Sequence, residues 1–104
     1  MINPLVVTSS KQLRQLLHRE RRLAEDRVKL FRDSLVPLQD ANLELARTAY
    51  QSGRESILTV LLAQESLIRT KLDYAAAARD LAVSTANLER QLAGPIPEPM
   101  PGGP

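Results

Sequence analysis

A single glycine, Gly53, lies between two long stretches of helical sequence pattern and limits the folds that this chain can adopt. It is the only glycine between Met1 and Ala93. It is therefore the one position in that range where the backbone takes a positive φ at little steric cost, as a helix C-cap requires. Ser56 follows three residues later and suits the N-cap of a returning helix. We predict an all-α fold, a long antiparallel helical hairpin with its turn at about residues 51–55.

Apolar residues recur at helical spacing on both sides of this turn. Between Leu13 and Ala49 they are separated mostly by three, four or seven positions, which is typical of a buried helix face. The spacing continues from Ile57 to Leu92. Two helices alone would leave apolar flanks uncovered, so we expect further helices, from an oligomer or from the rest of a larger protein, to pack against them.

The ends of the chain differ in composition from its middle. We expect residues 10–93 to form the hairpin, with Ser9 or Ser10 capping the first helix, and residues 1–9 to be irregular. Residues 94–104 contain five of the seven prolines and three of the four glycines. This tail is predicted to be disordered, with a Pro-rich ligand for an adaptor domain as the alternative.

Pro37 interrupts the first helical stripe. Proline in a helix interior removes a backbone donor and clashes with the preceding turn, which costs about 3 kcal/mol. Either one long helix kinks there or two helices abut. We favour a kink, because no glycine or polar loop flanks the proline.

Charge is distributed unevenly along the chain, although the formal net charge is only +2. Residues 11–33 hold eight Lys or Arg and four acidic residues, and the remainder holds six and eight. The signs alternate at i, i+4 spacing, as in Arg21, Glu25 and Lys29, which is typical of a solvated helix face. Nucleic-acid binding is not expected, because neither a short recognition helix nor stacking aromatics accompany the basic residues.

The residues do not predict catalysis, a metal or a cofactor. There is no cysteine, and the one histidine, His18, lies beside arginines and is interpreted as a solvated helix residue. No phosphate-binding loop, HExxH motif or nucleophile elbow is present. No run approaches the roughly 20 apolar residues of a membrane-spanning helix, and the first residues do not resemble a secretion signal.

The segment around the turn resembles a known family. The run LELARTAYQSGRESILTVLLAQ, residues 43–64, is similar to the C-terminal repeat of TolC-type outer-membrane efflux proteins. The likeness continues to Gly94. Upstream, the run LFRDSLVP, residues 30–37, resembles the heavy-metal and multidrug branch of that family, in which many relatives carry a proline at the position of Pro37.

This resemblance implies a role in a trimeric efflux duct. In the family an outer-membrane β-barrel continues into a periplasmic α-barrel, through which an inner-membrane pump and a periplasmic adaptor protein expel drugs or metal ions. The matching segment is a hairpin of the α-barrel, so the resemblance implies a periplasmic location at the outer membrane. Its turn would dock the adaptor through Tyr50, Gly53, Arg54, Glu55, Ser56, Ile57 and Leu58.

Two further positions would line the entrance of the duct, Thr59 and Leu62. Many relatives carry Asp or Glu there, so the resemblance does not extend to a ring of acids that favours cations. Because the likeness covers about residues 30–94, we expect the chain to be a fragment, a truncated reading frame or one part of a split duct. The alternative is a free-standing helical hairpin that binds a partner helix through its exposed stripe.

Overall fold

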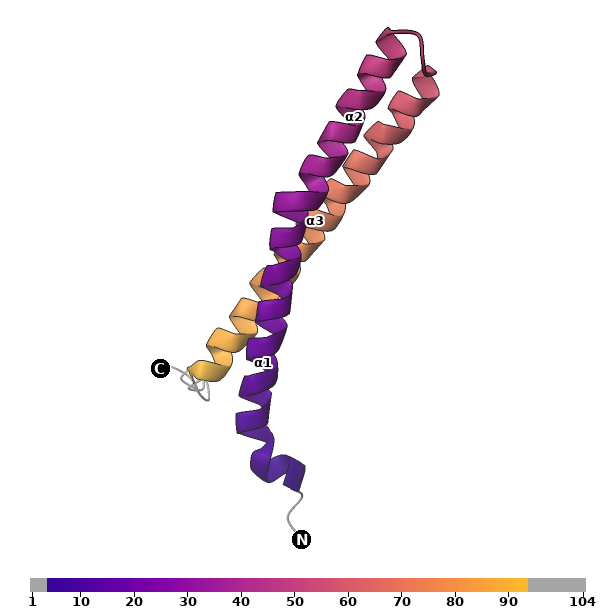
Figure 1. Ribbon diagram of the computed structural model, residues 1–104. Helices are drawn as coiled ribbons and strands as arrows, with labels where there is room; N and C mark the ends of the chain where they lie inside the picture. The colour runs from indigo at the N-terminus through magenta and orange to yellow at the C-terminus, as the bar shows by residue number, and fades with distance from the viewer. Residues whose placement is uncertain (1–3, 94–104) are drawn as a thin grey trace, which may run out of the picture.

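The computed structural model describes residues 4–93, and these form a long antiparallel helical hairpin (Figure 1). Four helical elements follow one another: α1 (Pro4–Leu30), the π-helical segment η1 (Phe31–Leu35), α2 (Val36–Gln51) and α3 (Ile57–Leu92). No strand occurs among the described residues. The predicted all-α hairpin is confirmed.

The hairpin is a rod rather than a compact domain. We call α1, η1 and α2 together the ascending arm, because they follow one another without a loop and all pack against α3. The molecule measures 73 × 38 × 21 Å, and its radius of gyration is 22.5 Å. A compact chain of this length would have a radius of gyration of about 13 Å. Each of the two helical arms therefore packs against the other along one face only.

The core is a single thin row of side chains between the ascending arm and α3. Leu43 and Ala46 of α2 pack with Val60 and Leu67 of α3, and the partly buried Ala63 completes this cluster. The buried residues outside the cluster all lie nearer the end opposite the turn: Ala24, Ala77 and Leu88. Small residues at two of these positions let α1 approach α3 closely.

Leucines, two isoleucines, one valine and one tyrosine remain exposed along both arms. Each of these residues is at least 42% exposed; they are Leu13, Leu16, Leu23, Leu30, Leu38, Leu45, Tyr50, Ile57, Leu58, Leu61, Leu62, Ile68, Leu72, Val83 and Leu92. A two-helix rod buries one stripe of each helix, so apolar residues beside that stripe stay in contact with solvent.

The first helix begins earlier than the sequence indicates. Helix α1 starts at Pro4 rather than near Ser9 or Ser10, so the segment predicted to be irregular is helical from Pro4 onward. Proline suits the first helical position, because its missing N–H would have no partner there and its φ is already helical. The predicted disordered tail, residues 94–104, lies outside the described residues.

Pro37 is accommodated without a loop. The segment immediately before it, η1, is a π-turn in which the amide of Val36 donates to the carbonyl of Phe31, five residues earlier. Pro37 then lies in the first turn of α2, where its missing N–H is tolerated. The ascending arm therefore stays helical through Pro37, as the preferred interpretation of one long helix requires, and the irregularity is a π-turn.

Candidate functional site

The chain reverses at one end of the rod, which we call the tip, residues 50–58. The amide of Gly53 donates to the carbonyl of Tyr50 at 3.0 Å, and the amide of Arg54 donates to that of Ala49 at 2.8 Å. These two bonds form a Schellman motif, in which the residue after the helix adopts a left-handed conformation. Gly53 takes that role with φ +76°, which confirms the predicted C-cap.

Side chains stiffen the same turn. The hydroxyl of Ser52 donates to the carbonyl of Thr48 at 2.9 Å, and the guanidinium Nε of Arg54 donates to the hydroxyl oxygen of Ser52 at 3.2 Å. The amide of Glu55 adds a second bond to the carbonyl of Ala49, at 3.2 Å. The predicted docking residues Arg54 and Glu55 thus take part in the hydrogen bonding that shapes the turn.

The returning helix begins where the sequence indicates but is capped differently. Ser56 occupies the N-cap position with extended backbone angles, and its carbonyl accepts from the amide of Thr59 at 3.1 Å. Its side chain makes no capping hydrogen bond. Instead, the hydroxyl of Thr59 donates to the carboxylate of Glu55 at 3.2 Å. The acidic group near the first turn of α3 is favourable, because helix N-termini carry partial positive charge.

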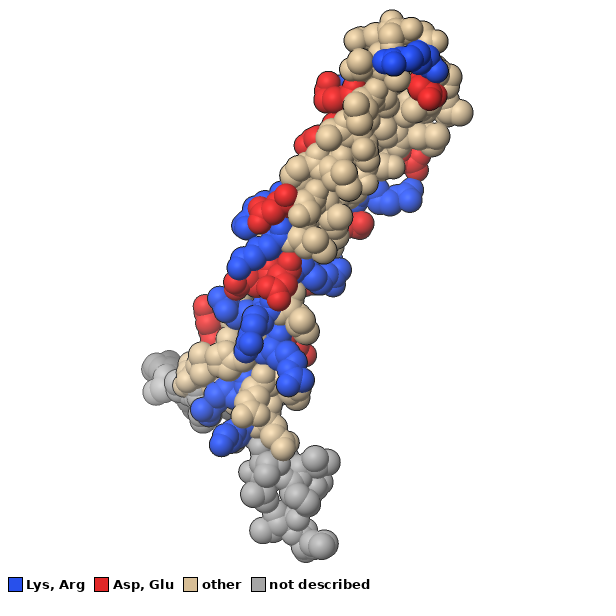
Figure 2. Space-filling model, viewed as in Figure 1, with Lys and Arg blue, Asp and Glu red and all other residues tan. Residues whose placement is uncertain are grey.

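Three large apolar side chains remain in solvent at the tip. Tyr50 lies in the last turn of α2 and is 46% exposed, while Ile57 and Leu58 begin α3 and are 48% and 58% exposed. Figure 2 shows few charged side chains over the upper half of the rod on the face in view. The tip therefore presents apolar groups on a hydrogen-bonded turn, a combination typical of protein-binding surfaces.

A shallow groove runs from the tip down the side of the rod between α2 and α3. Thr59 and Leu62 lie in this groove, and Leu62 is 53% exposed. Leu45 faces them from α2 and is 69% exposed. The groove is lined by Gln39, Asn42, Leu45, Ala46, Ala49, Glu55, Thr59, Leu62, Ala63 and Ser66. It can accommodate an apolar side chain or helix ridge from a partner.

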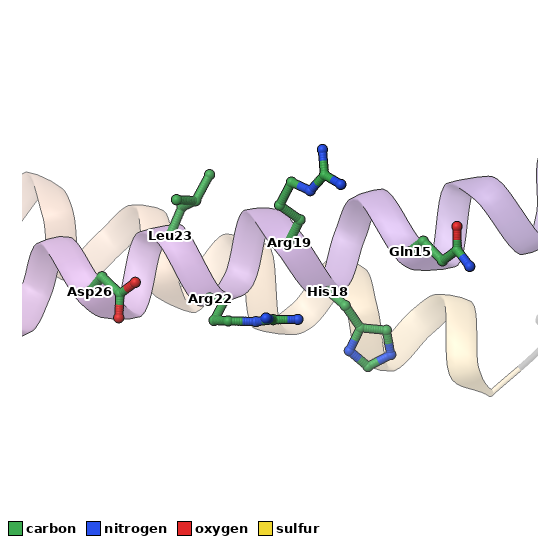
Figure 3. Close-up of a pocket in the computed structure, with 6 residues that line it drawn as sticks. All are labelled: Gln15, His18, Arg19, Arg22, Leu23 and Asp26. Atoms are coloured by element: carbon green, nitrogen blue, oxygen red, sulfur yellow. The ribbon is translucent and has the colours of Figure 1, made fainter.

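His18 lies in an open hollow on the surface of α1 with Gln15, Arg19, Arg22 and Asp26. Figure 3 shows His18 pointing to the opposite side of α1 from Arg19. Every residue of this hollow comes from one helix and is exposed. Within residues 4–93 no group of three His, Asp or Glu side chains is placed to hold a metal ion.

The ion pairs lie on the surface. Glu25 pairs with Arg21 at 3.6 Å and with Lys29 at 3.2 Å, as the alternating charges predict. Asp33 instead pairs with its neighbour Arg32 at 2.8 Å. The hydrogen bond from Arg32 lowers the pKa of the Asp33 carboxyl, and the same bond raises the pKa of the guanidinium. Such exposed pairs contribute little to stability.

Some features of the surface were not predicted from the sequence. The groove brings Leu45 of α2 opposite Leu62 of α3, and only the register of the two helices in the hairpin determines which residues face each other there. The hollow on α1 joins residues whose i, i+3 and i, i+4 spacing the sequence does contain, so a helical projection would have found it.

Comparisons with known proteins give no relatives. A scan of protein-family models, a search of curated proteins and a search of solved structures each found no match to this chain. No helix in the described part combines the length and the apolarity needed to cross a bilayer. The fold defines the chain as an elongated two-helix hairpin with an apolar tip.

Proposed function

We propose that this chain is a periplasmic α-barrel hairpin of a TolC-type efflux duct in the outer membrane, and that its tip docks the periplasmic adaptor of a tripartite pump. The duct would export drugs or metal ions taken up by an inner-membrane pump. The proposal starts from the likeness of residues 43–64 to that family. The proposed role requires no catalytic group and no cofactor.

The observation that carries the proposal is the tip. Tyr50, Ile57 and Leu58 expose apolar surface at the extreme end of a rod, on a turn held by backbone and side-chain hydrogen bonds. A pre-organised turn loses little conformational entropy when it binds, so more of the contact energy appears as affinity. Gly53 and Ser56 would act by shaping the turn, and Arg54 and Glu55 by holding it.

The flanks of the rod support an assembly of several hairpins. Leu45, Leu61 and Leu72 are 69%, 52% and 65% exposed, although two packed helices already share a core. Neighbouring hairpins in a trimeric barrel would cover such residues. In that arrangement Thr59 and Leu62 would lie near the entrance, and their uncharged side chains would give it no preference for cations.

Site-specific photo-crosslinking in the native host tests the docking. A photoreactive residue in place of Leu58 is expected to capture the adaptor, identified by mass spectrometry. The same residue in place of Val83, which is 53% exposed and lies far from the tip, is the matched control. Capture at position 83 alone, or at neither position while the protein accumulates normally, would contradict the docking proposal.

Efflux itself gives the second test. In a duct that contains this hairpin, Ile57→Asp or Leu58→Asp should impair resistance to exported compounds while the protein still reaches the outer membrane. A charge placed in an apolar contact lowers affinity, because it must be desolvated without a partner. Ala86→Asp, at an exposed position of α3 far from the tip, serves as a control for the general effect of a surface charge on α3. Normal resistance in both tip variants would remove the docking assignment.

The alternative function is a free-standing helical hairpin that acts as a protein–protein interaction module. The buried cluster of Leu43, Ala46, Val60 and Leu67 favours it, because the two helices contain a core of their own. Light scattering and circular dichroism across a concentration series separate the two functions. A helical signal that grows with concentration supports one piece of a larger barrel, and a stably helical monomer supports the interaction module.

A further inference from the structure

The base of α1, at the end of the rod opposite the tip, takes no part in the core. None of residues 11–23 is buried, and Ala24 is the first buried side chain that follows them. Figure 1 shows α1 and α3 diverging toward this end, whereas α2 and α3 run alongside each other near the tip. Most side chains of residues 11–23 are therefore exposed to solvent rather than packed in the core.

This base segment carries a basic face. Lys11, Arg14 and Arg22 are separated by steps of three and eight residues, so they lie on one side of the helix, and Arg19 lies one turn before Arg22. All four side chains are exposed, and none of them forms an ion pair within the described residues. Blue side chains gather over the lower part of α1 in Figure 2. The face extends about 17 Å along the helix.

The acidic residues nearby do not neutralise this face. The only acid between Lys11 and Arg22 is Glu20, which is two positions from Arg22 and hence on the other side of the helix. Glu20 lines a recess between α1 and α3 together with Leu23, Ala77 and Asp80. Asp26 marks the end of the basic face, since it lies one turn beyond Arg22 in the same hollow. The charge of the base is thus positive on its solvent side.

Exposed leucines accompany the basic residues. Leu16 and Leu23 are 51% and 58% exposed and lie three residues before and four residues after Arg19. Figure 3 shows Arg19 and Leu23 pointing to the same side of α1. A helix that presents arginines next to uncovered leucines is typical of segments that lie in the interface of a bilayer. Phosphates of nucleic acid would contact the arginines but would leave these leucines in water.

We propose that the base of α1 binds an anionic phospholipid surface, with Arg14, Arg19 and Arg22 at the headgroups and Leu16 and Leu23 at the acyl boundary. This inference rests on the geometry of α1 and not on adaptor docking at the tip. The chain contains one Phe and two Tyr, none of them between residues 11 and 23. Aromatic stacking platforms for single-stranded nucleic acid are therefore missing from this segment.

Vesicle co-sedimentation of the full chain tests the proposal. The protein is expected to sediment with vesicles of mixed phosphatidylcholine and phosphatidylglycerol. With vesicles of pure phosphatidylcholine it should stay in the supernatant. Binding should weaken with salt, because screening acts on exposed charges. Equal binding to both vesicles, no binding to either, or tighter binding to duplex DNA than to the anionic vesicles at the same salt concentration would overturn the proposal.

Matched charge variants locate the contact. Each basic residue near an anionic surface contributes roughly fivefold in binding, so Arg14→Gln, Arg19→Gln and Arg22→Gln together should weaken partitioning about 100-fold. The control combines Lys71→Gln, Arg79→Gln and Arg90→Gln, three exposed residues of α3. Both triple variants change the net charge from +2 to −1. An equal loss in the two variants would assign the binding to net charge alone and contradict a site on α1.

Fluorescence adds a measurement that does not depend on removing charges. The chain contains no tryptophan, so a single introduced tryptophan is the source of all the tryptophan fluorescence. Leu16→Trp should shift its emission to shorter wavelength when anionic vesicles are added, because the ring leaves water. Leu61→Trp, in the half of α3 near the tip and equally exposed, should not shift. A shift at position 61 and none at position 16 would place the lipid contact elsewhere and overturn the proposal.

Discussion

The amide of Val36 donates to the carbonyl of Phe31, five residues earlier, and so forms a π-turn directly before Pro37. An α-helical pattern through this region would leave the carbonyl of Asp33 facing the proline ring, which causes the clash that proline introduces in a helix interior. Widening the preceding turn relieves the clash while the helix continues. The ascending arm therefore passes its proline with a local change in hydrogen bonding and no loop.

Pro37→Ala should stabilise the hairpin. The substitution restores a backbone donor and removes the ring, and we expect a gain of about 1–3 kcal/mol in the free energy of unfolding. Chemical denaturation followed by circular dichroism measures it. Asn42→Ala, on the exposed surface of α2, is the control and should gain no more than about 0.5 kcal/mol. Equal gains in the two variants would mean that Pro37 imposes no cost of its own.

Gly53→Val should destabilise the turn because of its backbone conformation. Nothing lies within 4 Å of the position that a Cβ would occupy, so the cost arises from φ +76° and not from a clash with neighbouring residues. A non-glycine residue pays about 1–2 kcal/mol in this region, and a β-branched residue pays more. Gly53→Asn is the control, because asparagine tolerates this conformation. A melting temperature unchanged in Gly53→Val would contradict the role of Gly53 as C-cap.

Leu43→Ala should destabilise the hairpin far more than Leu45→Ala. Leu43 is 6% exposed in the core cluster, whereas Leu45 is 69% exposed two residues later on the same helix. Removing a buried leucine costs about 2–5 kcal/mol, and the lower end applies here because a thin core collapses readily onto the gap. The exposed change should stay within about 0.5 kcal/mol. Thermal unfolding at low protein concentration tests this, and a larger loss from Leu45→Ala would point to a partner on the groove.

The Arg32–Asp33 pair should respond to acid in a defined direction. The hydrogen bond from Arg32 lowers the pKa of Asp33, so the contact favours the folded state at neutral pH. That contribution is lost as the pH falls through the lowered pKa, below about pH 4. Titration by NMR should show the Asp33 pKa rising in Arg32→Gln and unchanged in Arg69→Gln, which removes the partner of Glu65 instead. An unchanged Asp33 pKa in Arg32→Gln would show that the pair does not persist in solution.

Much of the fold follows from sequence pattern alone. Long apolar periodicity on both sides of one glycine specifies two antiparallel helices, and Gly53 adopts the conformation that only glycine takes easily. Ser56 occupies its predicted position, yet Glu55 rather than the serine side chain makes the local contact, with Thr59. The choice between neighbouring polar groups depends on side-chain geometry that spacing does not encode.

The other differences between the structure and the sequence-based predictions also arise from geometry that the sequence pattern leaves open. The π-turn before Pro37 was not predicted, because a kink, a break and a π-turn all satisfy the same sequence. The groove that contains Thr59 and Leu62 depends on the register between α2 and α3, which two separate helical stripes leave free to vary. The lone histidine was predicted to be a solvated residue, and His18 is exposed on α1.

The length of α3 fixes a spacing between the two ends of the molecule. Its 36 residues, without a proline or glycine, give a straight run of about 54 Å. Whatever binds at the tip is therefore held at a set distance from whatever binds at the base of the hairpin. Lengthening or shortening both arms by whole helical turns would change that distance in steps of about 5 Å while leaving each binding surface intact.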